Sequence, residues 1–369
     1  MTARLDVISV AGARPNFMKI APLAHALGAL EGVRHRVVHT GQHYDKNMSS
    51  LFFTELGIPD PWRNLEVGSS THARQTAEIM VGFDEVLDED PCDVVCVVGD
   101  VNSTIACALV AVKRGIPVAH VEAGLRSFDR SMPEEVNRVL TDAISDTLFV
   151  TEPSGMEHLA SEGVDDGRTF LVGNVMIDTL LRHRERARQS DVLQRVGVEE
   201  KGYGVVTLHR PSNVDDPSIL AGIMEALRNI GGRLPLVFPV HPRTAERMES
   251  AGFRARADGG FIACDPLGYL DFLRLMEGAA LILTDSGGIQ EEACILGVPC
   301  LTLRENTERP VTIEIGMNKL VGSDPAVIQR EGMAILDAKP EPAKAPDLWD
   351  GKAAERIAQI LLGRYGRRS

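Results

Sequence analysis

Residues 93–121 read DVVCVVGDVNSTIACALVAVKRGIPVAHV, and this stretch decides the fold class. The run Val94–Val98 is apolar without alternation, which is typical of a strand that is buried on both faces. Ser103–Arg114 follows with apolar residues at helical spacing, and Val118–Val121 is again a short apolar run. A strand, a helix and a second strand in this order predict a parallel β-sheet with right-handed crossovers.

The same alternation continues on both sides of this stretch and forms two series. The strands expected in the first series are Leu5–Val10, Val37–His39, Val94–Val98, Val118–Val121 and Thr147–Val150. Those of the second are Gly204–Leu208, Leu236–Val240, Phe261–Ala263, Leu281–Leu283 and Pro299–Leu303. Helices are expected at Thr76–Leu87, Ser103–Arg114 and Thr179–Gln194.

A chain of 369 residues exceeds the roughly 250–300 residues that one core supports, so two domains are expected. We predict an α/β protein of two Rossmann-like, doubly wound domains that face a cleft, over residues 1–175 and 176–350. Lys339–Pro346 is rich in Pro, Lys and Ala, which indicates a linker. It leads into a last helix, Gly351–Leu362, and we expect residues 351–369 to pack back on the first domain.

Composition excludes several classes of function. The formal net charge is −13, which disfavours broad binding of nucleic acid on electrostatic grounds. The six cysteines include no Cys-x-x-Cys pair and lie mostly in apolar runs, as expected for reduced, buried thiols. No signal peptide and no apolar stretch of roughly 18–20 residues is visible, so a cytoplasmic protein without membrane segments is predicted.

Two loops have the composition of anion-binding sites. Gly12 to Lys19 (GARPNFMK) follows the first strand, and its glycine, Arg14 and Lys19 suit a ligand phosphate, although a solvated helix start explains them equally well. Thr284–Glu292 (TDSGGIQEE) follows a strand of the second series. We favour ligand binding there over a simple helix cap, because two adjacent glycines weaken a helix.

Further polar groups follow strands. Asp100, Glu122, His209 and His241 each lie at the end of an expected strand, the edge at which open α/β sheets bind ligands. Glu134 and Glu135 follow Pro133, where acids stabilise a helix start, and Glu134 is the freer of the two to face a ligand. Neither histidine has a partner at metal-ligand spacing, so no metal is expected. The dinucleotide fingerprint is lacking, so NAD is not indicated.

Taken in order, these segments resemble the non-hydrolysing UDP-N-acetylglucosamine 2-epimerases. The resemblance extends from Gly12 to about Gly322 and rests on RPxxxK, TGQH, GD, HVEAGLRS, PEExNR, HRP, PVHPR, LTDSGGIQEEA and TERP. It implies a two-domain fold like that of GT-B glycosyltransferases, a nucleotide-sugar substrate, a homodimer and no redox cofactor.

The resemblance also implies roles for individual residues. Asp100, Glu122 and Glu134 match the family's catalytic carboxylates. Positions that match UDP-sugar contacts or line the site are Arg14, Lys19, Gln42, Arg138, His209, His241, Ser286, Gly287, Gly288, Glu292 and Arg309. His209 and the helix start at Ser286 are expected to stabilise the departing diphosphate.

The implied chemistry explains the need for several acids. Elimination of UDP, in a transition state with oxocarbenium character, and loss of the C2 proton give 2-acetamidoglucal. Addition of UDP after protonation on the other face then inverts C2. One carboxylate on each face serves as base in one direction and as acid in the other. The sequence does not assign the three carboxylates to faces.

Three positions depart from the family pattern. Asn16 replaces an acid, Pro211-Ser212 replaces Arg-Glu after His209-Arg210, and Tyr44-Asp45 replaces a basic stretch. In bacterial members, the replaced arginine and the segment near TGQH help to bind a second, activating UDP-GlcNAc. We therefore predict weak or absent activation by substrate.

Other functions share parts of this pattern. A hydrolysing relative would release UDP and free N-acetylmannosamine, and a related epimerase would act on a 2,3-diacetamido or uronic acid sugar. A GT-B glycosyltransferase or a UDP-sugar sensor would bind the same nucleotide without exchanging the C2 hydrogen.

Overall fold

The computed structural model describes residues 3–12, 14–41, 55–240, 242–250, 260–339 and 344–368. The chain forms two compact units, of which the first comprises Met1–Arg182 and Asp347–Ser369 and the second His183–Pro346. The chain passes between the units inside helix α7 (Val175–Ala187), and not at the start of that helix, where the sequence placed the boundary.

The first unit is built around an eight-stranded sheet with helices on both faces. Strands run in the order β3-β2-β1-β4-β5-β6-β7, all parallel, and β14 adds an antiparallel pair to the start of β1. The described strands are β1 (Ala3–Ala11), β2 (Val33–His39), β3 (Arg63–Asn64), β4 (Val94–Val98), β5 (Val118–Ala123), β6 (Thr147–Val150), β7 (Thr169–Leu171) and β14 (Arg367–Arg368). The described helices are α1 (Arg14–Gly28), α3 (His72–Glu89), α4 (Asn102–Lys113), α5 (Pro133–Ile144), α6 (Pro153–Ser161), α7 and α16 (Ala353–Tyr365), with a 3-10 turn at Asp166–Arg168.

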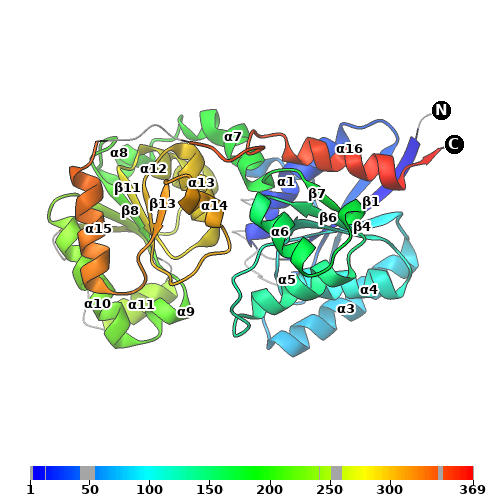
Figure 1. Cartoon of the computed structure of the whole chain (residues 1–369), viewed down its shortest axis with the longest axis horizontal. Coiled ribbons are helices and arrows are strands. Elements are labelled where there is room, and N and C mark those ends of the chain that lie inside the picture. Colours follow the sequence, from blue (N-terminus) through cyan, green and yellow to red (C-terminus); the bar gives the residue numbers. More distant parts are fainter. Residues whose placement is uncertain are drawn as a thin grey trace. The chain divides into compact units, whose positions relative to one another are not determined.

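Helix packing in this unit follows from apolar burial. Helices α3, α4 and α5 lie side by side on one face of the sheet, and α1 and α16 pack together on the other (Figure 1). Every residue of Val94–Val98 is buried, as expected for a central strand covered on both faces. The last helix is held by Asp178 of α7, whose carboxylate accepts the N–H groups of Ala353 (3.1 Å) and Ala354 (2.7 Å).

The second unit repeats this plan with six parallel strands in the order β10-β9-β8-β11-β12-β13. Its described strands are β8 (Gly204–Thr207), β9 (Leu236–Pro239), β10 (Phe261–Cys264), β11 (Leu281–Thr284), β12 (Cys300–Thr302) and β13 (Asn318–Leu320). Its described helices are α8 (Val192–Val196), α9 (Pro211–Val214), α10 (Pro217–Gly231), α11 (Pro242–Ser250), α12 (Tyr269–Gly278), α13 (Gly287–Leu296), α14 (Pro310–Glu314) and α15 (Pro325–Asp337).

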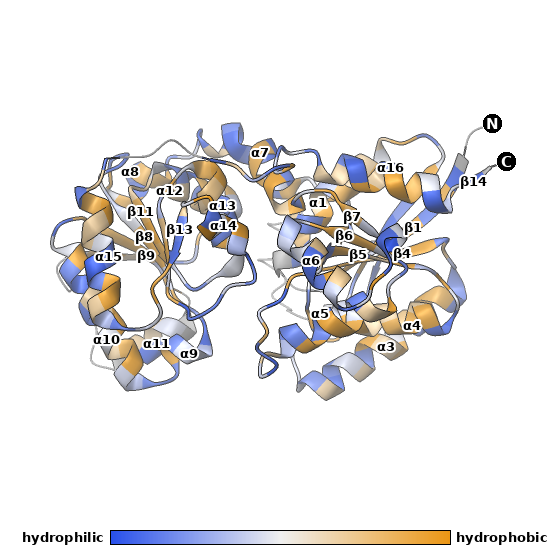
Figure 2. Cartoon of the chain, in the orientation of Figure 1, coloured by the Kyte–Doolittle hydropathy of each residue, from blue (hydrophilic) through white to orange (hydrophobic). Residues whose placement is uncertain are grey.

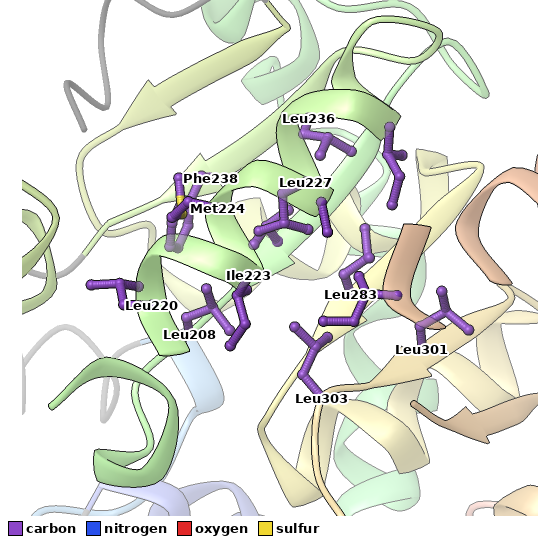
Figure 3. Close-up of a cluster of buried hydrophobic side chains, with 14 of the residues drawn as sticks. Leu208, Leu220, Ile223, Met224, Leu227, Leu236, Phe238, Leu283, Leu301 and Leu303 are labelled. Carbon is purple, nitrogen blue, oxygen red and sulfur yellow. The ribbon is translucent and has the colours of Figure 1, made fainter. Parts of the chain in front are cut away.

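Helices α10 and α15 pack on this sheet through an apolar core. Helix α10 contributes Ile223 and Leu227, which are fully buried in one cluster with Leu283 of β11 and Leu301 of β12 (Figure 3). The apolar residues concentrate in the strands and on the inward faces of the helices in both units (Figure 2). Such burial contributes roughly 1.5–3 kcal/mol for each large aliphatic side chain.

The α/β class with two doubly wound sheets is confirmed, and every strand that the sequence predicts is present. The single helix predicted at Thr179–Gln194 is wrong. It begins earlier, as α7, and is interrupted before α8, because the Ser190 hydroxyl accepts the N–H of Val192 and turns the chain. Strands β3, β7, β13 and β14 were not predicted, because each has only two or three residues and none lies in an unbroken apolar run.

The strand order locates the ligand edge of each sheet. In the first sheet the order reverses between β1 and β4, and in the second between β8 and β11. Open α/β sheets bind ligands outside the carboxyl ends of the two strands at such a switch point. A ligand-binding site is therefore expected at the loops that follow β1, β4, β8 and β11.

Candidate active site

At the switch point of the first sheet, Asn16 joins the loop after β1 to the end of β4. Its side-chain oxygen accepts the N–H of Gly12 (3.3 Å), and its amide nitrogen donates to the carbonyl of Val98 (3.0 Å). Asn16 is buried, and its two hydrogen bonds hold the glycine loop against the end of β4. One turn further along α1, Lys19 forms a buried ion pair with Glu122 at the end of β5.

Gly99 leaves the space in which this ion pair lies. The residue has φ +69°, and a Cβ atom there would lie 3.2 Å from Lys19 Nζ and 3.3 Å from Glu122 Oε2. A side chain at this position would therefore be strained in its backbone and crowded against both charged groups. Asp100 is the next residue along the chain after Gly99.

Glu122 has a strained backbone of its own. Its φ is +72°, a left-handed conformation that is uncommon for a residue with a side chain. The register between β5 and β6 shifts at this residue, which makes Glu122 the extra residue of a bulge. Bulges re-aim side chains next to active sites, and strain of this kind costs about 1–3 kcal/mol. The backbone thus directs the Glu122 carboxylate toward Lys19.

A buried polar network supports this edge from within the sheet. His120 contacts both neighbours through its ring: Nε2 donates to the carbonyl of Gly99 (2.8 Å), and Nδ1 lies 2.7 Å from Asp142 Oδ1. Asp142 also accepts from Arg126 Nη1 (2.7 Å). Burial alone raises the pKa of Asp142, but His120 and Arg126 together hold that pKa below its usual value. Sequence reasoning missed Asp142, because nothing local links it to His120.

Helix α5 brings a second ion pair to the same edge. Arg138 pairs with Asp100, and its Nη1 lies 2.8 Å from Glu135 Oε2. Glu135 is buried and accepts the backbone N–H groups of Ser127 and Phe128 (2.9 Å each), so it shapes the preceding loop. Glu134 is exposed in the first turn of α5 and lies one turn from Arg138 on the helix surface.

The switch point of the second sheet is marked by a histidine and an aspartate. His209 Nδ1 lies 2.7 Å from Asp285 Oδ1, so the pair joins the ends of β8 and β11. Asp285 is fully buried, whereas the His209 side chain is 58 % exposed. Burial alone raises the pKa of Asp285, but hydrogen bonds from His209 and from the backbone hold that pKa below its usual value. The carboxylate is therefore ionised at neutral pH.

Helix α13 presents its amino end at the same edge. Ser286 is the N-cap residue, and Ser286, Gly287 and Gly288 are half-buried. A Cβ atom on Gly287 would lie 2.9 Å from Arg309 Nη1, so the bare glycine admits the guanidinium to the helix start. Glu291 Oε1 lies 2.8 Å from Arg309 Nε and holds this cation in place. Free N–H groups beside a guanidinium make a site for a phosphate group.

Glu292 lies deeper in the same helix. The Tyr269 hydroxyl donates a hydrogen bond to Glu292 Oε1, with 3.1 Å between the two oxygens. Burial, with the charge of Glu291 in addition, raises the pKa of Glu292 to about 8, although the Tyr269 hydrogen bond lowers it. Glu292 is therefore largely protonated at neutral pH. Tyr269 was not foreseen, because it precedes Glu292 by a whole helix and a strand.

Comparison with known proteins identifies the family. The family model described as UDP-N-acetylglucosamine 2-epimerase matches residues 25–362. The chain belongs to the UDP-N-acetylglucosamine 2-epimerase family. It is 42% identical to the UDP-N-acetylglucosamine 2-epimerase of Methanocaldococcus jannaschii over 97% of this chain and 98% of that protein. It is 38% identical to UDP-2,3-diacetamido-2,3-dideoxy-D-glucuronate 2-epimerase of Pseudomonas aeruginosa, over 97% of this chain and 99% of that protein.

A solved structure agrees with this assignment to the epimerase family. The crystal structure of M. jannaschii UDP-GlcNAc 2-epimerase in complex with UDP-GlcNAc and UDP superposes with a TM-score of 0.90. It covers 97% of this chain and 100% of that chain, at 42% identity. The resemblance inferred from the motifs is confirmed, and so is the GT-B-like α/β fold.

Within this epimerase, most predicted site residues group by sheet. In the first unit Lys19 meets Glu122 and Arg138 meets Asp100, whereas Glu134 is placed on the same helix as Arg138. In the second unit His209, Ser286, Gly287, Gly288 and Arg309 gather at one edge, with Glu292 buried behind them. Arg14 opens α1, and Gln42 and His241 lie outside the described residues.

Two further observations concern other classes of protein. Among the described residues, no group of three or more His, Cys, Asp or Glu side chains is placed to hold a metal ion. None of the helices in the described ranges combines the length and the apolar character that a membrane span requires.

Proposed function

We propose that this chain interconverts UDP-GlcNAc and UDP-ManNAc by reversible epimerisation at C2. The observation that carries the proposal is the complementary chemistry of the two switch points, each taken within its own unit. Asp100 and Glu122 lie at that of the first sheet, and the start of α13 lies with His209 at that of the second. Acids suit proton transfer at the sugar, and a helix start with Arg309 suits a diphosphate.

The proposed roles divide between the two sheets. The second sheet holds UDP: the amides of α13 and Arg309 bind the diphosphate, and Glu292 binds the ribose. The first sheet supplies the acids proposed to act on the sugar, and Lys19 and Arg138 orient their partners Glu122 and Asp100. Other residues proposed to contact the substrate are Arg14, Gln42, Glu134, His241, Ser286, Gly287 and Gly288.

The reaction proceeds by elimination and re-addition. The C1–O bond to UDP breaks and the electron pair stays on the diphosphate oxygen, while a carboxylate takes the C2 proton and a double bond forms between C1 and C2. Reprotonation of C2 from the other face and return of UDP to C1 give the epimer. Asp100 and Glu122, with Glu134 as a third acid, are the proposed proton carriers.

The test is hydrogen exchange at C2. Purified protein in D₂O with UDP-GlcNAc should give both epimers with deuterium at C2, measured by proton NMR. We expect Asp100→Asn and Glu122→Gln each to lower kcat by roughly 10²–10⁴-fold, because each removes a proton carrier. Glu157→Gln is the matched control, since Glu157 is an exposed carboxylate on α6. Wild-type protein that binds UDP-GlcNAc without exchanging C2 would contradict the proposal and favour a transferase or a sensor.

Two neighbouring activities remain as alternatives. The similarity to the Pseudomonas aeruginosa enzyme named above favours, as a second candidate, epimerisation of a 2,3-diacetamido uronic acid sugar. Faster turnover of that UDP-sugar than of UDP-GlcNAc would establish it. Release of free N-acetylmannosamine with an equal amount of UDP would instead mark a hydrolysing enzyme.

We also propose that the chain forms a homodimer. Exposed apolar side chains lie on helices α3 and α5: Val81 is 62% exposed, Leu140 49% and Val136 41%. Large apolar side chains exposed on helices of one face are typical of protein interfaces.

Two further expectations remain predictions. One is a cytoplasmic location. The other is weak or absent activation by substrate, because Pro211, at the start of α9, offers no charge and no N–H.

A further inference from the structure

The contact between His209 and Asp285 occupies one ring nitrogen of the histidine and leaves the other available to a ligand. His209 follows β8 and Asp285 follows β11, and hydrogen bonds between these adjacent strands bring the two side chains to 2.7 Å. His209 Nδ1 is committed to this contact. Within the described ranges Nε2 has no hydrogen-bond partner, and the ring is 58 % exposed, so Nε2 is the ring atom available to a ligand.

Asp285 is held rigidly. Its Oδ2 accepts the backbone N–H groups of His209 (3.0 Å) and Arg210 (2.9 Å) and the side-chain amide of Asn213 (3.2 Å). These donors fill the lone pairs of a carboxylate that is fully buried. A buried, ionised carboxylate with this many donors neither rotates nor exchanges its partner readily, so the orientation of the His209 ring is set by the fold.

We propose that Asp285 is a positioning residue, which keeps a proton on Nδ1 of His209 so that His209 exchanges its other proton with the substrate only at Nε2. The inference rests on the proposed epimerisation and adds a residue to it. When the C1–O bond breaks, the electron pair stays on the diphosphate oxygen, and that oxygen takes the Nε2 proton. When UDP adds back to C1, the oxygen returns the proton to Nε2.

Two features of the chemistry make this arrangement useful. The ionised Asp285 stabilises the doubly protonated ring, which is the form that can donate to a diphosphate. After the transfer, the neutral ring keeps its proton on Nδ1, so Nε2 is left as the acceptor for the reverse step. A histidine without a fixed partner would populate both neutral forms and lose part of this preference.

The first measurement reports on the ring itself and needs no substrate. NMR of isotope-labelled histidine nitrogens gives the position of the proton in the neutral ring. In the wild-type protein we expect the proton of His209 on Nδ1. In Asp285→Asn the amide can donate to Nδ1, so we expect the proton on Nε2. An unchanged position in Asp285→Asn would overturn the proposal.

The second measurement separates positioning from a structural role. For Asp285→Asn we expect kcat to fall by roughly 100-fold or more with an altered pH profile, and KM for UDP-GlcNAc to change by less than about 3-fold. Asp337→Asn is the matched control, because it makes the same substitution in the same unit at an exposed carboxylate that pairs with Arg233 on the surface. It should retain kcat within about 5-fold.

The outcomes also distinguish this inference from the proposed function. An Asp285→Asn variant with a raised KM and an unchanged kcat, or with a kcat no lower than that of Asp337→Asn, would overturn the positioning role while leaving epimerisation intact. A wild-type protein without C2 exchange would contradict the epimerisation, whereas the proton on Nδ1 would still be measurable.

Discussion

Single residues at the switch points show what backbone geometry contributes to the site. Gly99 and Glu122 both have positive φ, and both lie beside Lys19. Strain of this kind persists only where the surrounding structure holds it, and here it accompanies a buried ion pair. The left-handed Glu122 was not predictable, because the sequence HVEAG carries no sign that the bulge falls on the glutamate and not on the glycine.

Gly99→Ala tests this geometry. The added methyl group is strained by the positive φ and crowds Lys19 and Glu122, so we expect kcat to fall at least roughly 10-fold, with a loss of about 1–2 kcal/mol in the free energy of unfolding. Gly115→Ala is the control, because Gly115 has nearly the same φ (+70°) and nothing within 4 Å of an added Cβ. Equal activity in the two variants would show that the space beside the ion pair is not used.

At the scale of elements, prediction succeeded where burial alone decides the structure. Val94–Val98 and Thr147–Val150 were predicted to the residue, because unbroken apolar runs leave few alternatives. The switch points were not predicted, since they depend on strand order, which apolar patterns do not encode. For the same reason the sequence pointed to His209 but not to its partner Asp285, which is supplied by another strand.

The junction of α7 and α16 offers a test at this scale. Burial raises the pKa of Asp178 to about 6, and the charge of Asp350 adds to this, although the two backbone hydrogen bonds from α16 lower it. The folded-state pKa is thus above the usual value for Asp, so the folded protein binds this proton more tightly than the unfolded chain. Stability from this group is present at low pH and is lost as the pH rises toward 6.

Asp178→Asn should remove that dependence. As the pH rises from about 4 to about 6.5, we expect the denaturant concentration at the unfolding midpoint to fall in the wild-type protein relative to Asp178→Asn. Above that range the difference between the two proteins should change little. The measurement is denaturant unfolding of both proteins at a series of pH values. A difference that is constant with pH, or that changes in favour of the wild type as the pH rises, would contradict the assigned pKa shift.

At the scale of the whole molecule, the proposed homodimer accounts for the apolar surface of α3 and α5. Val136 and Leu140 lie one turn apart on α5, and exposure of both costs solvation free energy unless another surface covers them. We expect light scattering after size-exclusion chromatography to give twice the chain mass for the wild-type protein. Val136→Lys combined with Leu140→Lys should give the monomer mass, because two buried, unpaired charges would oppose association. Ala160→Lys, an exposed position on α6, should remain dimeric. A wild-type monomer, or a dimer unaffected by the charges on α5, would show that this surface is not the interface.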